Sequence, residues 1–219
     1  MHSISLIEPS WWQNLLQRWM NLQGRYDRIS NLAPIFADIF VVIYPVFLIW
    51  LYIYGIIRKK SVLKQWALFV FFATLFAVLI NIWIQTFFIK ERPIVVFNHI
   101  SAEETLLHDI LPTSSFPSDH AVVSMCFAIA VLLWWAYVRN KFLKVSWILL
   151  ILISFLMTAC RMLTLVHWPT DIIVWLLLWG VVPCILIIRP IRYCVLRFII
   201  NPVISFEQWI MKKVFKYEQ

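Results

Sequence analysis

Long runs of apolar residues alternate with short polar segments along this chain of 219 residues. Five runs come close to or exceed the roughly 20 apolar residues that a helix needs to cross a bilayer. They cover residues 35–57, 65–89, 119–138, 145–163 and 170–188. Asp38 lies near the start of the first run, where we place it at the membrane interface. The pattern predicts an all-α fold, a polytopic membrane helix bundle with five transmembrane helices.

A sixth span near 191–206 is left open, because two arginines, an asparagine and a proline in that stretch weigh against it. The segment 11–24 is too polar to span, but its apolar spacing predicts a helix lying in the membrane interface. We therefore divide the chain into an N-terminal interfacial segment (1–34), a transmembrane core (35–188) and a basic amphipathic tail (189–219). The first ten residues lack the basic start and apolar run of a signal peptide.

Composition supports an integral membrane protein with one domain. The chain is 63% hydrophobic and 14% charged, whereas soluble domains have about 25% charged residues. Its net charge of +8 would suggest nucleic-acid binding in a soluble protein. No basic patch interleaved with aromatic residues supports a nucleic-acid partner, and the tendency of lysine and arginine to remain in cytoplasmic loops explains the charge.

The distribution of this charge predicts the orientation in the membrane. The loops 58–64 and 139–144 and the tail contain 13 of the 19 lysines and arginines, whereas the alternate loops contain mainly acidic residues. Cytoplasmic loops are enriched in cations. The N-terminus is therefore expected outside and the C-terminus in the cytoplasm.

Three short polar islands interrupt the apolar pattern, at residues 90–93, 115–120 and 161–171. The predicted topology places all three on the outer side, so they can meet. Ionisable residues near hydrocarbon are costly, and their gathering at helix ends indicates a functional site. Asn81 and Gln85, which are one turn apart near the end of the second run, are expected to face the bundle interior.

The cations of these islands suit phosphate. Arg92 and Arg161 can each make bidentate, permanently charged contacts with phosphate oxygens, and Lys90 adds a third candidate contact. The alternative is that these cations bind no substrate and only extend to the membrane–water interface, as snorkelling side chains do. That alternative is weaker for Arg161, because its side of the membrane is poor in cations. For Lys90 the alternative is a solvated interfacial charge.

The second island opens a helix with Ser118, Asp119 and His120. The start of a helix presents unpaired backbone N–H groups and favours anions, so Ser118 is a candidate phosphate contact. His120 is placed to protonate a leaving oxygen as a general acid. Helix capping would explain Ser118 and Asp119 without chemistry, and a single interfacial histidine can be structural.

The third island places His167 and Asp171 four residues apart. A carboxylate that bonds one imidazole nitrogen fixes the tautomer and leaves the other nitrogen as a nucleophile. The alternative is an aspartate that caps a helix beside an incidental histidine. No HExxH helix or carboxylate-rich cluster accompanies these residues, so neither a metal nor another cofactor is predicted.

Together these residues resemble the type 2 phosphatidic acid phosphatase superfamily of membrane lipid phosphatases, whose signature is K-x6-RP, PSGH and SR-x5-H-x3-D. Residues 92–93 match the end of the first motif, residues 117–120 the second, and Arg161, His167 and Asp171 the third. The chain departs from the signature at three positions, which are Gln85 in place of Lys, Asp119 in place of Gly, and Cys160 in place of Ser. The form Ser-Phe-Pro-Ser-Asp-His looks like the branch of bacterial undecaprenyl pyrophosphate phosphatases associated with bacitracin resistance.

This resemblance implies a metal-independent phosphatase of the bacterial plasma membrane, with its active site on the outer face. The expected reaction converts undecaprenyl diphosphate into undecaprenyl phosphate. His167 would attack phosphorus and form a phosphohistidine, with Asp171 orienting it and His120 serving as acid and then base. Arg92, Ser118 and Arg161 would bind the phosphoryl oxygens.

Other functions remain open from the sequence. A phosphatase for phosphatidic acid or phosphatidylglycerophosphate and a lipid phosphotransferase use the same residues. A transporter or flippase for an anionic lipid would use the arginines without chemistry, but neither an inverted repeat nor Gly-broken midspan helices support it. A purely structural membrane subunit leaves the histidines unexplained. The acidic loop 94–114 is expected to shape the head-group pocket or to act as a lid.

Overall fold

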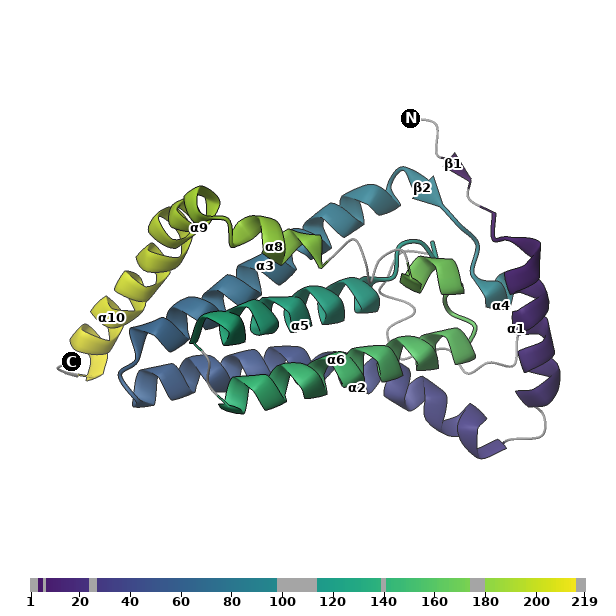
Figure 1. The fold of residues 1–219 in the computed structure, drawn as a ribbon, viewed down its shortest axis with the longest axis horizontal. Helices are drawn as coiled ribbons and strands as arrows, with labels where there is room; N and C mark the ends of the chain where they lie inside the picture. The colour runs from purple at the N-terminus through teal and green to yellow at the C-terminus, as the bar shows by residue number, and fades with distance from the viewer. Residues whose placement is uncertain are drawn as a thin grey trace.

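The computed structural model describes residues 4–5, 7–23, 27–97, 114–138, 141–173 and 180–215. This part of the chain is almost entirely helical and forms an elongated bundle (Figure 1). The longest helices are α2 (Asp27–Ile57), α3 (Ser61–Gln85), α5 (Asp119–Val138) and α6 (Lys141–Leu163). They run along the bundle and alternate in direction, so that α3 and α6 end where α5 begins.

Five stretches of helix among the described residues are long and apolar enough to cross a membrane, which confirms the predicted fold class. They are Leu32–Ile57, Ser61–Gln85, Asp119–Ala136, Lys141–Leu163 and Arg189–Val214. The first four correspond to the first four predicted runs. The second run was expected to continue to residue 89, but the helix ends at Gln85 because Phe88–Ile89 forms a short strand, β2.

Small residues bring α3 and α5 close together. Ala73 and Ala77 on α3 pack against Val122 and Cys126 on α5, and all four are completely buried. In a membrane, van der Waals packing drives helix association, and small side chains let the backbones approach closely. This contact fixes the end of α3 against the start of α5, where the polar residues of the second island lie.

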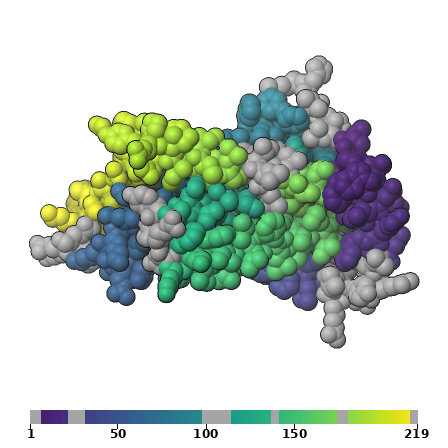
Figure 2. Space-filling view, in the orientation of Figure 1, coloured from purple at the N-terminus to yellow at the C-terminus, as the bar shows by residue number. Residues whose placement is uncertain are grey.

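The N-terminal segment closes one end of the bundle. Helix α1 (Ser10–Gln23) runs across this end at a steep angle to the long helices, as Figure 1 shows, and matches the helix predicted at 11–24. Its Leu16 packs against Leu165 and Trp168. Strand β1 (Ile4–Ser5), which was not predicted, pairs in parallel with β2. Figure 2 shows the same arrangement as a continuous surface in which α1 covers the end of the bundle.

After the third island the chain runs toward the opposite end. Residues 169–173 are helical and α8 covers Val181–Leu186, so the predicted span 170–188 is described only in part, because 174–179 lie outside the described residues. Helix α9 (Arg189–Val195), a π-helical turn η1 (Leu196–Ile200) and α10 (Asn201–Phe215) then follow without interruption.

The C-terminal stretch was expected to lie along the surface, yet it is a candidate span by length and apolarity. Two features that weighed against a span there are accommodated locally. Pro202 is the second residue after η1, whose wider turn relaxes the i→i−4 pattern that a proline breaks. The Arg197 guanidinium donates a hydrogen bond of 2.7 Å to the Tyr193 hydroxyl one turn earlier.

One cation of the predicted cytoplasmic loop belongs to the core instead. Lys64 is buried in α3, and its Nζ lies 2.7 Å from Oε2 of Glu207 on α10. This ion pair joins α3 to α10 at the end of the bundle away from the three islands (Figure 1).

Candidate active site

The polar side chains of all three islands meet at the end of the bundle that α1 covers. The end of α3, the start of α5 and the end of α6 reach this point, and the segments around β2, α4 (Pro93–Val96) and residues 164–173 pass over it. Seven side chains predicted for the site are buried there, namely Lys90, Arg92, Ser118, His120, Arg161, His167 and Asp171. The structure thus brings the predicted residues together at one place.

A left-handed turn after α6 carries His167 back toward Arg161. Leu165 has a φ of 58°. The N–H of Leu165 bonds the carbonyl of Met162 at 3.0 Å, and that of Val166 bonds the carbonyl of Arg161 at 3.2 Å, which is the Schellman pattern. Leucine at this position costs about 1–2 kcal/mol because its Cβ crowds the carbonyl oxygen. Its buried side chain in the contact with α1 offsets that cost.

The imidazole of His167 is fixed by a backbone carbonyl. Its Nδ1 lies 2.7 Å from the carbonyl oxygen of Ser115. Because a carbonyl only accepts, we assign the ring proton to Nδ1, which leaves a lone pair on Nε2. Burial lowers the pKa of His167 well below its ordinary value of 6.5, and the positive charges of Arg161 and Arg92 lower it further. Nε2 therefore stays unprotonated, as a nucleophile requires.

Asp171 does not bond His167 as the spacing of four predicted. Its Oδ2 is 4.0 Å from Nδ1 of His167. That oxygen instead accepts hydrogen bonds from the Ser115 hydroxyl at 2.7 Å and from the backbone N–H of Trp168 at 2.9 Å. The bond from Trp168 is part of a capping arrangement, in which an acid in the first turn of a helix accepts from the backbone N–H of the residue that precedes the helix. Asp171 therefore supports Ser115, and Ser115 in turn holds the ring.

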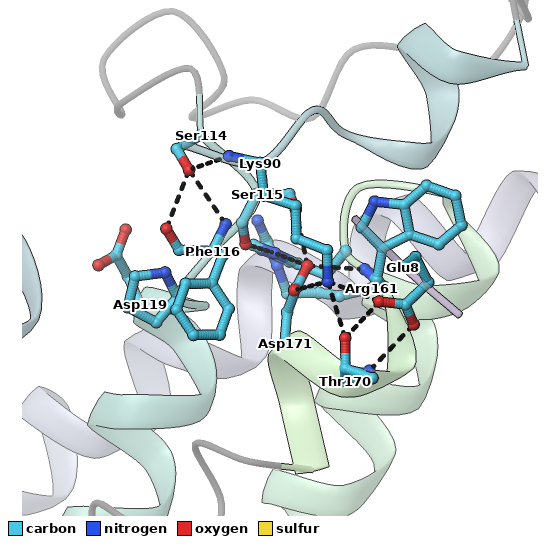
Figure 3. Close-up of polar contacts among 12 residues, drawn as sticks. Glu8, Lys90, Ser114, Ser115, Phe116, Asp119, Arg161, Thr170 and Asp171 are labelled. Carbon is cyan, nitrogen blue, oxygen red and sulfur yellow. Dashed lines mark hydrogen bonds and ion pairs between the residues drawn. The ribbon is translucent and has the colours of Figure 1, made fainter. Parts of the chain in front are cut away.

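Lys90 lies between two carboxylates, as Figure 3 shows. Its Nζ is 2.7 Å from Oδ1 of Asp171 and 2.6 Å from Oε2 of Glu8, and it donates to the Thr170 hydroxyl at 2.7 Å. The Thr170 hydroxyl also donates to Glu8. A lysine has three protons to donate, and these partners use all three. Lys90 is therefore not a solvated interfacial charge, which was the alternative considered for it.

A second cluster joins α2, α5 and α6. Nη1 of Arg161 is 2.8 Å from Oδ1 of Asp38 and 3.2 Å from Nε2 of His120. Asp38, which the sequence analysis placed at the membrane interface, is buried between the helices. An arginine only donates, so Nε2 of His120 accepts in this state.

Asp119 is held by the two amides that were predicted to face inward, which confirms that prediction. Nδ2 of Asn81 donates to Oδ1 of Asp119 at 2.6 Å, and Nε2 of Gln85 donates to the same oxygen at 3.1 Å. Gln85 also donates to the carbonyl of Pro117 at 3.0 Å. Asp119 interacts electrostatically with Arg92 and Arg161. It lies on the other side of the site from Lys90 (Figure 3).

The hydroxyl of Ser118 and Nε of Arg161 are buried donors at the site, and neither has a hydrogen-bond partner among the described residues. Buried polar groups are nearly always paired, so each exception calls for an explanation. An anion between these donors would satisfy both. Burial lowers the pKa of Arg92, whereas the charges of Asp119 and Asp171 raise it. The cluster can therefore hold a phosphoryl group in front of a neutral histidine.

An apolar groove leads away from this cluster along the bundle. It encloses about 650 Å³ between α2, α3 and α5. Val78 on α3 and Val123 on α5 line it, and these residues are three positions from Asn81 and His120. Residues three apart lie on the same helix face, so the groove begins one turn below the polar cluster. It can hold a hydrocarbon chain whose head group lies at the cluster.

The comparison with known families agrees with this geometry. A family model described as the PAP2 superfamily matches residues 66–198, which is more than half of the chain. The chain belongs to the PAP2 superfamily. With its candidate membrane spans, this PAP2 protein is a membrane phosphatase whose substrate is a lipid in the bilayer. Neither a curated protein nor a solved structure matches it.

The matched region of this PAP2 protein contains the three islands but leaves out two carboxylates that reach them. Glu8 and Asp38 both precede residue 66. Sequence reasoning missed their roles. Asp38 carries a signal that could have been used, because an acid inside an apolar run is a functional candidate. Glu8 carries none, since it reaches Lys90 only through the pairing of β1 with β2.

The expected head-group loop lies almost wholly outside the described residues, which stop at 97 and resume at 114. Ser115, which directly follows that loop, does contribute to the site of this PAP2 protein. The backbone N–H of Ser115 bonds the carbonyl of Lys90 at 2.8 Å, which places the carbonyl of Ser115 beside His167.

Proposed function

We propose that this protein is a metal-independent phosphatase that removes the terminal phosphate of an isoprenoid lipid diphosphate, with undecaprenyl diphosphate as the substrate and undecaprenyl phosphate as the product. The observation that carries the proposal is the bond between Nδ1 of His167 and the Ser115 carbonyl. It leaves Nε2 of a buried histidine unprotonated close to Arg92 and Arg161. That arrangement suits nucleophilic attack on phosphorus.

In the first step, the Nε2 lone pair of His167 forms a P–N bond with the terminal phosphorus. The P–O bond to the leaving phosphate breaks, and its electron pair goes to the leaving oxygen. Protonated His120 gives its proton to that oxygen and becomes neutral. The product lipid phosphate leaves, and the terminal phosphoryl group stays on His167.

In the second step, neutral His120 takes a proton from water. The resulting hydroxide attacks the phosphorus, the P–N bond breaks, and its electron pair returns to Nε2 of His167. Phosphate is released and His120 is protonated again. General acid–base catalysis of this kind contributes about 10²–10⁴-fold to a rate.

Arg92, Arg161 and Ser118 bind the phosphoryl oxygens in this proposal. The two guanidinium groups stabilise the negative charge of the transition state, and the hydroxyl of Ser118 has no other partner among the described residues. Lys90 has a different role from the direct contact that the sequence suggested. It neutralises Asp171 and keeps the carboxylate beside Ser115.

The apolar groove supports a substrate with a long hydrocarbon chain. It opens between α2 and α3, whose large apolar side chains Ile49 and Phe71 are exposed beside it. A lipid could enter sideways from the bilayer and keep its tail in an apolar environment. The motif Ser-Phe-Pro-Ser-Asp-His supports an undecaprenyl chain, because it resembles the branch that acts on that lipid.

We place the site on the outer face of the plasma membrane and the C-terminus in the cytoplasm. The cations of the turn at 58–60 and of α10 lie at the end of the bundle opposite the site, which agrees with the enrichment of cations in cytoplasmic segments. A lipid released outside the cell by transfer of its cargo would reach the site without crossing the membrane.

The test is phosphate release by the detergent-purified protein in EDTA. Undecaprenyl diphosphate, phosphatidic acid and phosphatidylglycerophosphate are compared, with His167→Ala as the control. The proposal expects EDTA-resistant release, fastest from the diphosphate and absent in the variant. Faster release from a glycerolipid would contradict the substrate, and activity in His167→Ala would contradict the nucleophile. Transfer of phosphate to another lipid instead of water would indicate a phosphotransferase.

A further inference from the structure

Asp38 is a buried acid that the family region does not contain. It lies in the first half of α2, and its side chain is 5% exposed. Its Oδ1 is 2.8 Å from Nη1 of Arg161 and 3.8 Å from Nε2 of His120. A buried carboxylate is costly unless it is paired, so its position beside both groups needs a reason.

The proton required on His120 is opposed by its neighbours. Arg161 on α6 donates to Nε2 in the resting state, so this nitrogen carries no proton until the arginine moves. Arg92 adds a second positive charge, and His167 lies on the same side of the site. The nearby acids are Asp119 on α5, whose Oδ1 is held by Asn81 and Gln85, and Asp38. Asp38 is the acid with an oxygen 3.8 Å from Nε2.

Binding of phosphate changes this arrangement. A phosphoryl group attracts Arg161 away from Asp38 and His120, since a dianion competes with a single carboxylate for the guanidinium. The negative charge of Asp38 then stays beside the imidazole, and Arg161 no longer donates to Nε2. The arrival of substrate thus creates the conditions under which His120 holds a proton.

We propose that Asp38 is the positioning residue of the general acid: it pairs with Arg161 in the resting state and with protonated His120 once Arg161 has moved to the phosphate. This inference rests on the proposed function. The need for Asp38 depends on the leaving group of the substrate. A leaving alkoxide is strongly basic and needs a proton in the transition state, whereas a leaving phosphate has a second pKa of about 6 and needs it far less.

The experiment compares two substrates with the same tail, an isoprenoid monophosphate and the corresponding diphosphate, in Asp38→Asn and the wild type. We expect Asp38→Asn to lower kcat on the monophosphate about 100-fold and on the diphosphate less than about 10-fold, as loss of a general acid does. In a single turnover, where hydrolysis of the common phosphohistidine does not enter, His120→Gln should show the same unequal loss in the rate of lipid release, and the double variant should add nothing to it. A role limited to holding Arg161 would lower both activities equally.

The matched control is Glu207→Gln, which removes the acid of a partly buried ion pair with Lys64 far from the site. Glu207→Gln should lower the midpoint of thermal unfolding, and any loss of kcat should be the same for the monophosphate and the diphosphate. If Asp38→Asn does not yield a folded protein by gel filtration, Asp38→Glu is compared instead, because it keeps the charge and displaces it by one methylene. An unequal loss in that variant supports the inference, and an equal loss or none overturns it.

The two proposals fail in different ways. A wild type that releases phosphate from neither lipid overturns the proposed function and this inference with it. A wild type that is active on both lipids and loses activity equally on both when Asp38 is changed overturns this inference alone.

Discussion

A histidine is a useful nucleophile only when one ring nitrogen holds the proton and the other keeps its lone pair. In this protein the backbone carbonyl of Ser115 selects the tautomer, and burial with two nearby arginines keeps the ring neutral. The sequence predicted His167, His120, Arg92 and Arg161 from residue type and spacing. It could not predict the carbonyl, because a backbone group leaves no trace in residue identity.

The neutrality of His167 is testable without substrate. Its pKa is lowered in the folded state, so the ring should stay neutral as the pH falls through 6.5, while an unfolded chain would take up the proton. Stability from this group is therefore present above pH 6.5 and is lost below it. Titration of ¹⁵N-labelled imidazole signals by NMR, assigned with His167→Gln, checks this. A ring that titrates at its ordinary pKa would contradict the electrostatic account.

The cluster around Lys90 predicts a coupled response. Lys90→Met leaves two buried carboxylates, Glu8 and Asp171, without their cation, and should reduce the free energy of unfolding by about 3–5 kcal/mol. Glu8→Gln removes one of these charges, so it should restore part of the lost stability in the Lys90→Met background. Thermal unfolding of the two single variants and the double variant, followed by tryptophan fluorescence, measures the coupling. Strictly additive losses would argue against the cluster.

At the scale of elements, the junction of α3 with α5 explains two departures from the family signature together. Gln85 stands where the signature has lysine, and Asp119 stands where it has glycine. Nε2 of Gln85 donates a hydrogen bond of 3.1 Å to Oδ1 of Asp119. The neutral amide of Gln85 thus pairs with the carboxylate on α5, and no buried lysine is needed at position 85. The helices themselves were predicted well because apolar length decides them, whereas this pairing depends on their packing.

This junction predicts that Asp119 weakens the affinity for phosphate. Asp119→Asn retains an oxygen that can accept from Asn81 and Gln85, so stability should change little. Loss of one negative charge near Arg92 and Arg161 should strengthen inhibition by inorganic phosphate about tenfold, equivalent to roughly 1.4 kcal/mol. The inhibition constant of phosphate for the wild type and the variant provides the measurement. An unchanged constant would place Asp119 outside the electrostatic field of the site.

On the scale of the whole molecule, the fold separates a polar end from an apolar length. Hydropathy and charge were enough to predict that the three islands share one end. They did not predict that α1 and β1 close that end, because those contacts involve few apolar residues and one short strand. They left the span Arg189–Val214 open, since scattered cations hide its overall apolarity.

The groove gives a prediction at this scale. Leu75→Trp, a change in the groove lining, should raise the KM for a diphosphate with a long isoprenoid chain and leave that for a short chain nearly unchanged. Leu79→Trp is the matched control, because Leu79 is exposed one turn away on α3 and does not line the groove. The measurement is the KM of the wild type and of both variants for diphosphates of several isoprenoid chain lengths. An equal effect of both variants at every chain length would contradict the tail site.

The proposed mechanism depends on passage of the phosphoryl group through His167. The most direct measurement uses His120→Gln, in which hydrolysis of the intermediate should be slow, exposed briefly to lipid diphosphate in EDTA and then digested for mass spectrometry under alkaline conditions. We expect a base-stable, acid-labile phosphoryl group on His167 that is absent when His167 is changed to Ala. A phosphoryl group on another residue, or phosphate release with none on the protein, would contradict it.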